Sequence, residues 1–484
     1  MQQNKNTNSI SEIDAYCQNS SVTLVNIFTQ LLGQFDLRYI NKLFSGTKRR
    51  GIEGFKIFQT LFVLRFLDFG NVAQLMQSGF SKELSHKKDV FYSFLNNAHI
   101  QWRKIMLLFF KQIITLIISQ SEEDGDHPKF LVLDDTFIGK TGKKMEFMGK
   151  VYDHSSHTHQ LGMKVLTLGY TDGKSFLPID FSIHNEAGKS GKRGLKAKEL
   201  KVQFSKTRHS QSAGYQRALE VATDKISVGI EMIKNCTTKW LKVDYVLVDS
   251  WFTCEKLIKE IRSIKAKGAA KKLHVIGLMK TDRIIIIDGK SYKASLIPEI
   301  KRKNIQNCRK YKCQYISFEF EYKGIKMRGY WIKMNGQQNW HLLISTNEKL
   351  TFVKAMTYYK NRWSIEVFFK DCKQNLGLES CQSTDFDAHI ATISIVFMNY
   401  MVLALKKRFE DYETLGILFR DLQAIMLQQS IVERIWTVFV HWFESLFSFM
   451  AVDWTLCIRN VINKQDEILK NISSSLIPLY ARTQ

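Results

Sequence analysis

The chain has 484 residues, of which 45% are hydrophobic and 12% aromatic. That composition excludes a disordered chain and provides enough apolar surface for a large core, in roughly two to four domains. Lys and Arg together number 70 against 46 Asp and Glu, which gives a formal net charge of +24. An excess of that size favours a polyanionic partner, usually nucleic acid, over a merely basic surface.

The sequence gives no signal for export or membrane insertion. The first residues, MQQNKNTNSISEID, are polar and lack the apolar segment of a signal peptide. The eight cysteines form no CxxC pair, which is typical of reduced thiols in the cytoplasm. The apolar run at 390–405 is shorter than a membrane span needs, so we expect a buried helix there. We therefore predict a cytoplasmic protein with no membrane partner.

Helices are predicted for the first 122 residues. Apolar residues recur there at spacings of three and four, between breaks formed by Gly and Asn. The same pattern fits a small DNA-binding bundle and a packed support domain, and both remain open.

After residue 122 the apolar period becomes that of β-strands, and helices return only near residue 348. Strands with turn residues between them are predicted at 130–139, 159–183, 244–254 and 273–279, and further short alternating strands between 280 and 346. We predict a mixed α/β region that contains a β-rich insert.

The segment 188–209 between these strands is rich in Lys and Arg. We expect it to follow the DNA backbone, with Lys192, Arg193 and Lys196 among its contacts, and to become ordered on binding. A purely solubilising loop is the alternative.

Two apolar strands end in aspartate, in the sequences LVLDDT and VLVDS. Asp is disfavoured inside strands, and at the carboxyl end of an α/β sheet it commonly faces a ligand, although it can also cap the next turn. Three converging carboxylates repel one another unless cations lie between them. Two Mg²⁺ ions, or Mn²⁺ as a substitute, would serve this role and support in-line phosphodiester chemistry.

The stretch YYKNRWSIEVFFKDCKQNLG, residues 358–377, is predicted to form one helix. At 100° per residue, Tyr359, Arg362, Glu366 and Lys373 fall in a stripe roughly 60° wide. The stripe suits a metal ligand flanked by groups that contact phosphates. A simple i,i+4 ion pair between Arg362 and Glu366 explains the same spacing.

These residues resemble the insertion-sequence-four family of bacterial DDE transposases, whose signature is Tyr-x2-Arg-x3-Glu-x6-Lys. The strands DDT and LVDSWF, and a β-rich insert before the signature, are also similar to that family. The resemblance covers roughly residues 85–405. It implies an α/β, RNase H-like (retroviral-integrase-like) catalytic core that is interrupted by a β-rich insert and flanked by N- and C-terminal helical regions.

The resemblance also implies a domain order. The expected parts are a helical DNA-binding or support domain at 1–122, the first part of the core at 123–280, the β-rich insert at 281–346, the second part of the core at 347–405, and a C-terminal helical region at 406–484 that takes part in dimerisation.

Site residues follow from the same resemblance. Asp249 and Glu366 correspond to the second and third metal ligands, and the family pattern Asp-x-Thr selects Asp134 as the first, with Asp135 as an alternative. The signature residues other than Glu366, which are Tyr359, Arg362 and Lys373, would hold DNA phosphates. Trp340 matches by approximate spacing an aromatic residue that stacks on a flipped base, and a core tryptophan is the alternative.

The sequence therefore predicts a magnesium-dependent cut-and-paste transposase of the bacterial nucleoid. The resemblance implies cleavage through a hairpin, strand transfer, and a homodimer bound to terminal inverted repeats and target DNA. Two alternatives are a catalytically inactive DNA-binding descendant and a structure-specific nuclease of RNase H-like fold.

Overall fold

The computed structural model describes the part of the chain between residues 28 and 427. Within it the gaps are 30, 48–50, 79, 82–83, 85–86, 121–126, 154–155, 187, 189–192 and 265–271. The chain divides into two compact units, residues 1–30 with 422–484, and residues 31–421. Most of the predicted dimerisation region 406–484, and Lys192, lie outside the described residues.

Helices form the part of the chain that precedes the sheet. They are α3 (Arg38–Ser45), α4 (Gly54–Val63), α5 (Val72–Gln77), α6 (Lys88–Leu95) and α7 (Trp102–Gln120). Their core is aromatic: the rings of Phe44 and Phe58 stack with centroids 5.0 Å apart, and Trp102 packs edge-on against Phe94 at 5.9 Å. The expected helical spacing is therefore present, with phenylalanine as the main packing residue.

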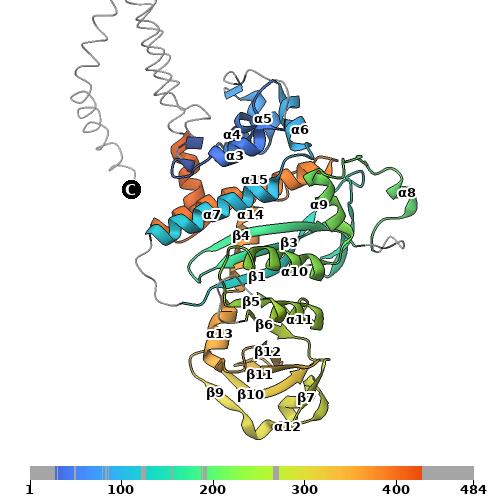
Figure 1. Cartoon of the computed structure of the whole chain (residues 1–484), viewed down its shortest axis with the longest axis vertical. Coiled ribbons are helices and arrows are strands. Elements are labelled where there is room, and N and C mark those ends of the chain that lie inside the picture. The colour runs from blue at the N-terminus through green and yellow to red at the C-terminus, as the bar shows by residue number, and fades with distance from the viewer. Residues whose placement is uncertain are drawn as a thin grey trace, which may run out of the picture. The chain divides into compact units, whose positions relative to one another are not determined.

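The first six strands lie in one sheet, covered by helices on both faces (Figure 1). They are β1 (Phe130–Gly139), β2 (Gly149–Asp153), β3 (Thr158–Thr171), β4 (Phe176–His184), β5 (Tyr245–Val248) and β6 (His274–Met279). β3 is antiparallel to β1, β2 and β4, whereas β5 and β6 run parallel to β1. β1 and β5 therefore run in the same direction, and β1 continues to Gly139 beyond the end of β5.

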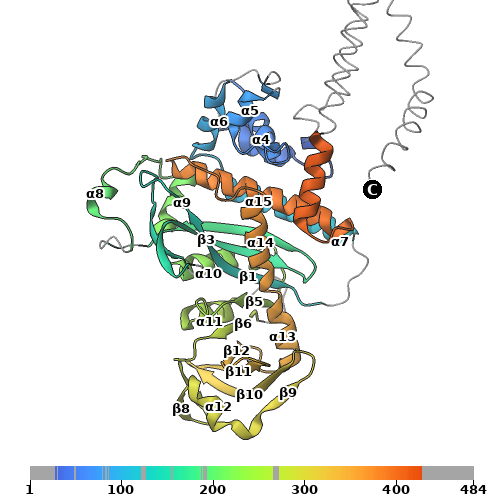
Figure 2. The ribbon, with the colours of Figure 1, turned by 180° about the vertical axis from the view of Figure 1, so that it is seen from behind.

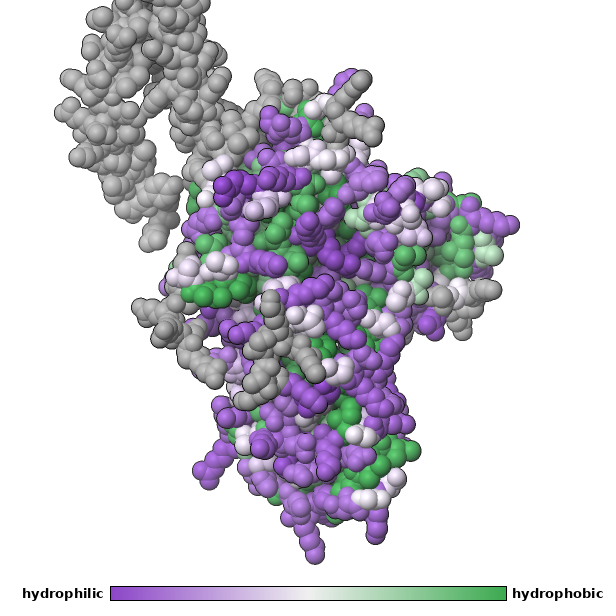
Figure 3. Space-filling model, in the orientation of Figure 1, coloured by the Kyte–Doolittle hydropathy of each residue, from purple (hydrophilic) through white to green (hydrophobic). Residues whose placement is uncertain are grey.

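The predicted β-rich segment continues this sheet instead of forming a separate one. Its strands are β7 (Ile284–Ile287), β8 (Lys290–Lys293), β9 (Gln306–Cys308), β10 (Cys313–Tyr322), β11 (Ile325–Met334) and β12 (His341–Ser345), with the short helix α12 (Ile297–Ile300). β12 pairs with β6 in antiparallel register, so that all twelve strands belong to one sheet. Hydrophilic side chains cover much of the insert on the face seen in Figure 3.

The helices between β4 and β6 pack against the core strands. They are α9 (Ala213–Ala222), α10 (Lys225–Thr237) and α11 (Glu255–Ser263). α10 contacts β3, and α11 contacts β6. The side chain of Asp224 caps α10 by accepting the N–H of Ser227 at 2.9 Å, which fixes where this helix begins.

The predicted single helix 358–377 is two helices, α13 (Phe352–Lys360) and α14 (Trp363–Gln374), which follow each other in Figure 2. At the junction the N–H of Arg362 donates to the carbonyl of Tyr359 at 3.0 Å, a spacing of three residues instead of four. Because Asn361 and Arg362 keep right-handed helical dihedrals, the break is a tightened turn. The stripe calculated for one continuous helix is therefore only approximate.

The apolar run at 390–405 lies within α15 (Phe386–Phe409), a helix that extends beyond the run at both ends. Among the described residues it is the one helix whose length and composition would allow a membrane span, and 94% of its apolar window is buried inside the protein. That burial is typical of a central core helix, and α15 packs against α7, α14 and β4.

The basic segment between β4 and α9 forms an arm with the short helix α8 (Ala197–Leu200) at its side (Figure 1). Its apolar side chains Leu200, Val202 and Phe204 are exposed. Its last two cations anchor it: Lys206 Nζ lies 2.8 Å from Asp385 Oδ2, and Arg208 Nη1 lies 2.8 Å from Glu146 Oε1.

The anchoring of Arg208 corrects its assignment to a DNA-tracking loop. Its side chain is only 3% exposed, and its Nε also lies 3.1 Å from Asp387 Oδ2. A guanidinium held in this way is unable to reach a DNA backbone without breaking buried ion pairs. Arg208 is therefore a structural residue.

Arg208→Ala is expected to lower the free energy of unfolding by about 3–5 kcal/mol, because it leaves buried carboxylates without a partner. Arg193→Ala in the same arm is the matched control. Arg193 is 60% exposed and pairs with Glu186 at 3.2 Å, so its removal should cost less than about 1 kcal/mol. Denaturant unfolding measures both values, and an equally small change in the two variants would contradict the anchoring role.

Candidate active site

Two of the predicted carboxylates come from neighbouring strands. Leu133 pairs with Val248 in parallel register, so that Asp134, the next residue of β1, lies near Asp249, the first residue after β5. The prediction that the first strand ends at its aspartates is wrong, because β1 continues to Gly139 by pairing with β3. Asp249 Oδ1 accepts the N–H groups of Trp251 and Phe252 at 2.9 and 3.0 Å. These two bonds fix the Asp249 carboxylate in the turn that follows β5.

The carboxyl group of Asp134 is in an unfavourable position for a negative charge. Burial raises its pKa to about 7, and the charges of Asp249 and Asp135 add to the shift. Arg362 and the N–H of Asp135 act in the opposite direction without cancelling it. An additional cation beside Asp134 would therefore stabilise the charged form of this carboxyl group.

Arg362 joins the sheet carboxylate to the third predicted carboxylate. Its Nη1 lies 3.0 Å from Asp134 Oδ2, and its Nη2 donates to Glu366 Oε1. The i,i+4 ion pair considered from the sequence is therefore present, and the same guanidinium also reaches β1. Glu366 and Asp134, far apart in sequence, thus share one arginine.

With Arg362 between them, the carboxylates do not yet form a metal site. Among the residues that the structure describes, no three His, Cys, Asp or Glu side chains are grouped closely enough to hold a metal ion. The guanidinium supplies the positive charge between Asp134 and Glu366.

Asp135 points to the opposite face of the sheet, as alternation along a strand requires. Its carboxylate pairs with Lys225 from α10, and its Oδ1 lies 3.4 Å from Lys164 Nζ. Burial opposes its ionisation, but the charges of Lys225 and Lys164 outweigh that effect and hold the pKa of Asp135 below its ordinary value. Its charge is neutralised within the fold, whereas that of Asp134 is not.

The other signature residues lie around this centre. The buried hydroxyl of Tyr359 has no hydrogen-bond partner among the described residues, and burial raises its pKa to about 12. The Arg362 guanidinium lies 5.8 Å from the centre of the Tyr359 ring. Lys373 Nζ donates to the carbonyl of Phe137 at 2.6 Å and so ties α14 to β1.

The remaining predicted residues are placed differently. Trp340 is half-buried directly before β12, whose Leu342 pairs with Met279 at the end of β6, so Trp340 lies near the carboxyl end of β6. Arg193 and Lys196 are exposed on the arm and contact Glu186 and Glu199 there. The described contacts do not bring either of them to the carboxylates.

Two tryptophans beside the site were not singled out from the sequence. Trp363 follows Arg362 and is 62% exposed, and Trp251, in the Asp249 turn, is 41% exposed. Lys225 Nζ lies 4.1 Å from the centre of the Trp251 ring. The only signal in the sequence was an aromatic residue within two positions of a predicted site residue. An aromatic residue at such a position is equally typical of core packing.

Two family models match the chain. Residues 224–402 match a transposase DDE domain, and residues 72–284 match a DDE superfamily endonuclease. Asp249 lies within both matches, Asp134 within the second and Glu366 within the first. No curated protein matches the sequence. The two matches support a DDE transposase with nuclease activity on DNA, and the large mixed sheet fits a DDE endonuclease fold.

Because the pKa of Asp134 is raised in the folded chain, we predict that ionisation of this group lowers the free energy of unfolding. Between pH 3.8, its ordinary value, and about 7, the folded chain holds a proton that the unfolded chain has lost, so stability falls as pH rises through this window. In metal-free buffer, Asp134→Asn should be more stable than the wild type by about 2–4 kcal/mol at pH 8. The difference should shrink toward pH 4.5.

Unfolding at both pH values measures this, with the exposed Asp411→Asn as control, which should differ little from the wild type at either pH. A stability gain for Asp134→Asn that does not change with pH would contradict the assigned cause.

Proposed function

We propose that this chain is a cut-and-paste DNA transposase of the insertion-sequence-four family, with Asp134, Asp249 and Glu366 as its catalytic carboxylates. The observation that carries the proposal is the double ion pair of Arg362 with Asp134 and Glu366. It links the first strand of the sheet to the signature helix, 228 residues further along the chain.

An RNase H-like core is part of this proposal. It is supported by the strand order β4-β3-β1-β5-β6, in which three antiparallel strands are followed by two that run parallel to β1. The insert 281–346 then lies between β6 and α13. The division into 1–122, 123–280, 347–405 and 406–484 remains a prediction on the same basis.

The donor set fits Mg²⁺. Asp134, Asp249 and Glu366 offer only oxygen ligands, which Mg²⁺ prefers, and burial together with the neighbouring carboxylates raises the pKa of Asp134, an effect that a cation would offset. When bound, the ions would polarise the reacting phosphate and favour ionisation of the attacking hydroxyl. Mn²⁺ has the same ligand preference and is the expected substitute.

The chain's own residues bind and orient the DNA. Arg362 exchanges the carboxylates for a DNA phosphate, and the buried Tyr359 hydroxyl gains an acceptor there. Lys373 holds α14 against β1 and places a second cation beside the phosphates. Trp340, Lys192, Arg193 and Lys196 are proposed further DNA contacts. Double-stranded terminal repeats and target DNA are the proposed partners of a homodimer in the bacterial cytoplasm.

The reaction is a series of in-line displacements at phosphorus. Water attacks at the element end and releases a 3′-OH, and this 3′-OH attacks the phosphate of the opposite strand, closes a hairpin and displaces the 3′-oxygen of the flanking DNA. After the hairpin is opened by water, the 3′-OH attacks a target phosphate and displaces a target 3′-oxygen. No covalent bond between protein and DNA is needed, because positioning and charge stabilisation supply the catalysis.

Wild-type protein with Mg²⁺ is expected to nick end DNA and to join 3′-OH ends to target DNA. Glu366→Gln and Asp249→Asn should lower both rates by at least about 10²–10³-fold, because each removes a charged oxygen ligand that would hold the metal ions at the reacting phosphate. Glu319→Gln, on the insert surface, is the matched control and should retain activity.

A gel assay of nicking and strand transfer separates the alternatives. Cleavage without joining would favour a nuclease, and DNA binding without cleavage would favour an inactive descendant. Either result would contradict the transposase.

Arg362→Met provides a separate test of the exchange. Without DNA, this variant should bind Mn²⁺ about tenfold more tightly than the wild type, because no guanidinium competes for Asp134 and Glu366. With DNA, it should cleave at least about tenfold more slowly, because a phosphate contact is lost. Calorimetry and the cleavage assay measure the two effects, and unchanged metal affinity would refute the competition.

A further inference from the structure

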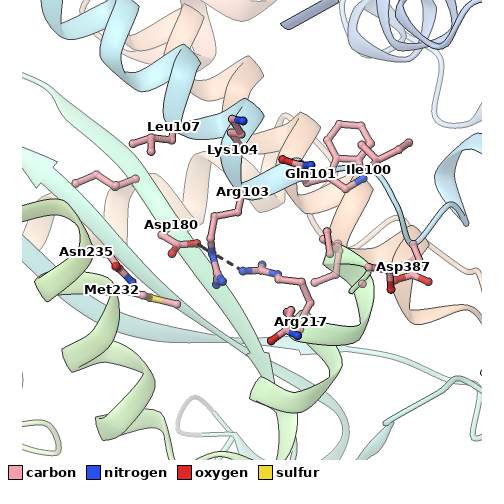
Figure 4. A pocket seen from close by; sticks show the side chains of 18 of the residues that line it. Ile100, Gln101, Arg103, Lys104, Leu107, Asp180, Arg217, Met232, Asn235 and Asp387 are labelled. Carbon is pink, nitrogen blue, oxygen red and sulfur yellow. Dashed lines mark hydrogen bonds and ion pairs between the residues drawn. The ribbon is translucent and has the colours of Figure 1, made fainter. Parts of the chain in front are cut away.

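A cavity of about 640 Å³ lies between α7, β4, α9 and α10 (Figure 4). None of the three proposed catalytic carboxylates lines it. Its volume is in the range of pockets that hold a molecule the size of a nucleotide. Its apolar wall includes Leu107, Ile179 and the ring of Trp240.

Two arginines lie at the centre of this cavity, and their side chains converge in Figure 4. Arg103 Nε lies 2.8 Å from Asp180 Oδ1, and its Nη1 lies 2.7 Å from Glu220 Oε1. Arg217 Nη1 is further from the same acids, at 3.5 Å from Asp180 Oδ1 and 3.4 Å from Glu220 Oε2. Arg103 therefore takes the close contacts with both carboxylates.

Arg217 is left with unused donors although it is only 5% exposed. Among the described residues its Nε has no hydrogen-bond partner, its Nη1 has only these two longer ion-pair contacts, and Nε1 of Trp102, which also lines the cavity, has no partner. Burial, together with the charge of Arg103, lowers the pKa of Arg217 to about 10. Buried donors without acceptors are rare and costly, so an acceptor-bearing ligand would stabilise this arrangement.

The mouth of the cavity adds positive charge without matching acids. Lys104, Lys111 and Lys239 are exposed there, and Lys111 Nζ lies 5.1 Å from the centre of the Trp240 ring. Asp387 is the other acid in the lining, and it is already paired with Lys206 and Arg208. A ligand that enters this cavity therefore meets a cationic rim and, inside, donors that lack close acceptors among the described residues.

We propose that this cavity binds a nucleotide phosphate ester. Its phosphate oxygens accept from Arg217 and from the mouth lysines, and its base lies against the apolar wall beside Trp240. The proposal rests on the cavity alone and does not depend on the proposed transposase reaction. The same chemistry has two sources, a free mononucleotide and a nucleotide at an accessible strand end of DNA.

The test uses the full chain with dAMP as probe, by calorimetry, and an end-containing oligonucleotide, by fluorescence anisotropy. The double variant Lys104→Glu/Lys239→Glu changes only exposed side chains, and Lys290→Glu/Lys326→Glu on the insert is the charge-matched control. Arg217→Gln, checked for folding by circular dichroism, is the second variant.

One-to-one dAMP binding that weakens at least tenfold in the mouth variant and in Arg217→Gln, but not in the control, supports a free nucleotide. If dAMP does not bind, a DNA source is supported by oligonucleotide affinity that falls at least fivefold more in the mouth variant than in the control. The slope of log affinity against log salt concentration should also become shallower, by the amount expected for the loss of about one to two phosphate contacts. The proposal is overturned if the mouth variant and the control behave alike with both probes.

Discussion

One guanidinium links the candidate site to the fold. Arg362 pairs at the same time with Asp134 in β1 and with Glu366 in α14, so it connects the first strand of the sheet with a helix that follows β12. The pairing offsets negative charge that would otherwise accumulate beside β1 and β5. In the proposed function, metal ions and a DNA phosphate would replace this pairing. Arginine suits this exchange because its planar fork binds carboxylate and phosphate in the same way.

The sheet gives neighbouring aspartates different environments. Because side chains alternate along β1, Asp134 faces Arg362, whereas Asp135 faces Lys164 and Lys225 on the other side. Lys225 also covers the ring of Trp251, which belongs to the turn that holds Asp249. Through Trp251, Lys225 thus links the ion pairs of Asp135 to the turn that positions Asp249. Asp134 has a raised pKa on one face of the sheet, whereas the charge of Asp135 is neutralised on the other. A perturbed group of this kind is expected at functional sites, which often lower the stability of the fold.

Most of the strands and the order of the motifs followed from the sequence because the apolar period is a local signal, but only β5 ends at its Asp, whereas β1 continues past Asp134. That Asp134 and Asp135 face opposite sides of the sheet depends on the direction of each side chain, which a one-residue shift reverses. Similarly, the break at Asn361 leaves the helical period almost unchanged, and the burial of Arg208 depends on acids more than sixty residues away. Contacts of this kind are set by tertiary packing, so composition and spacing do not reveal them.

A structure of the full chain with end DNA and Ca²⁺, a cation that supports binding without efficient cleavage, tests the central claim most directly. The account predicts that the cation is ligated by oxygens of Asp134, Asp249 and Glu366, and that Arg362 has moved from the carboxylates to a DNA phosphate. An Arg362 that still bridges Asp134 and Glu366 with DNA bound, and no cation between the carboxylates, would contradict it.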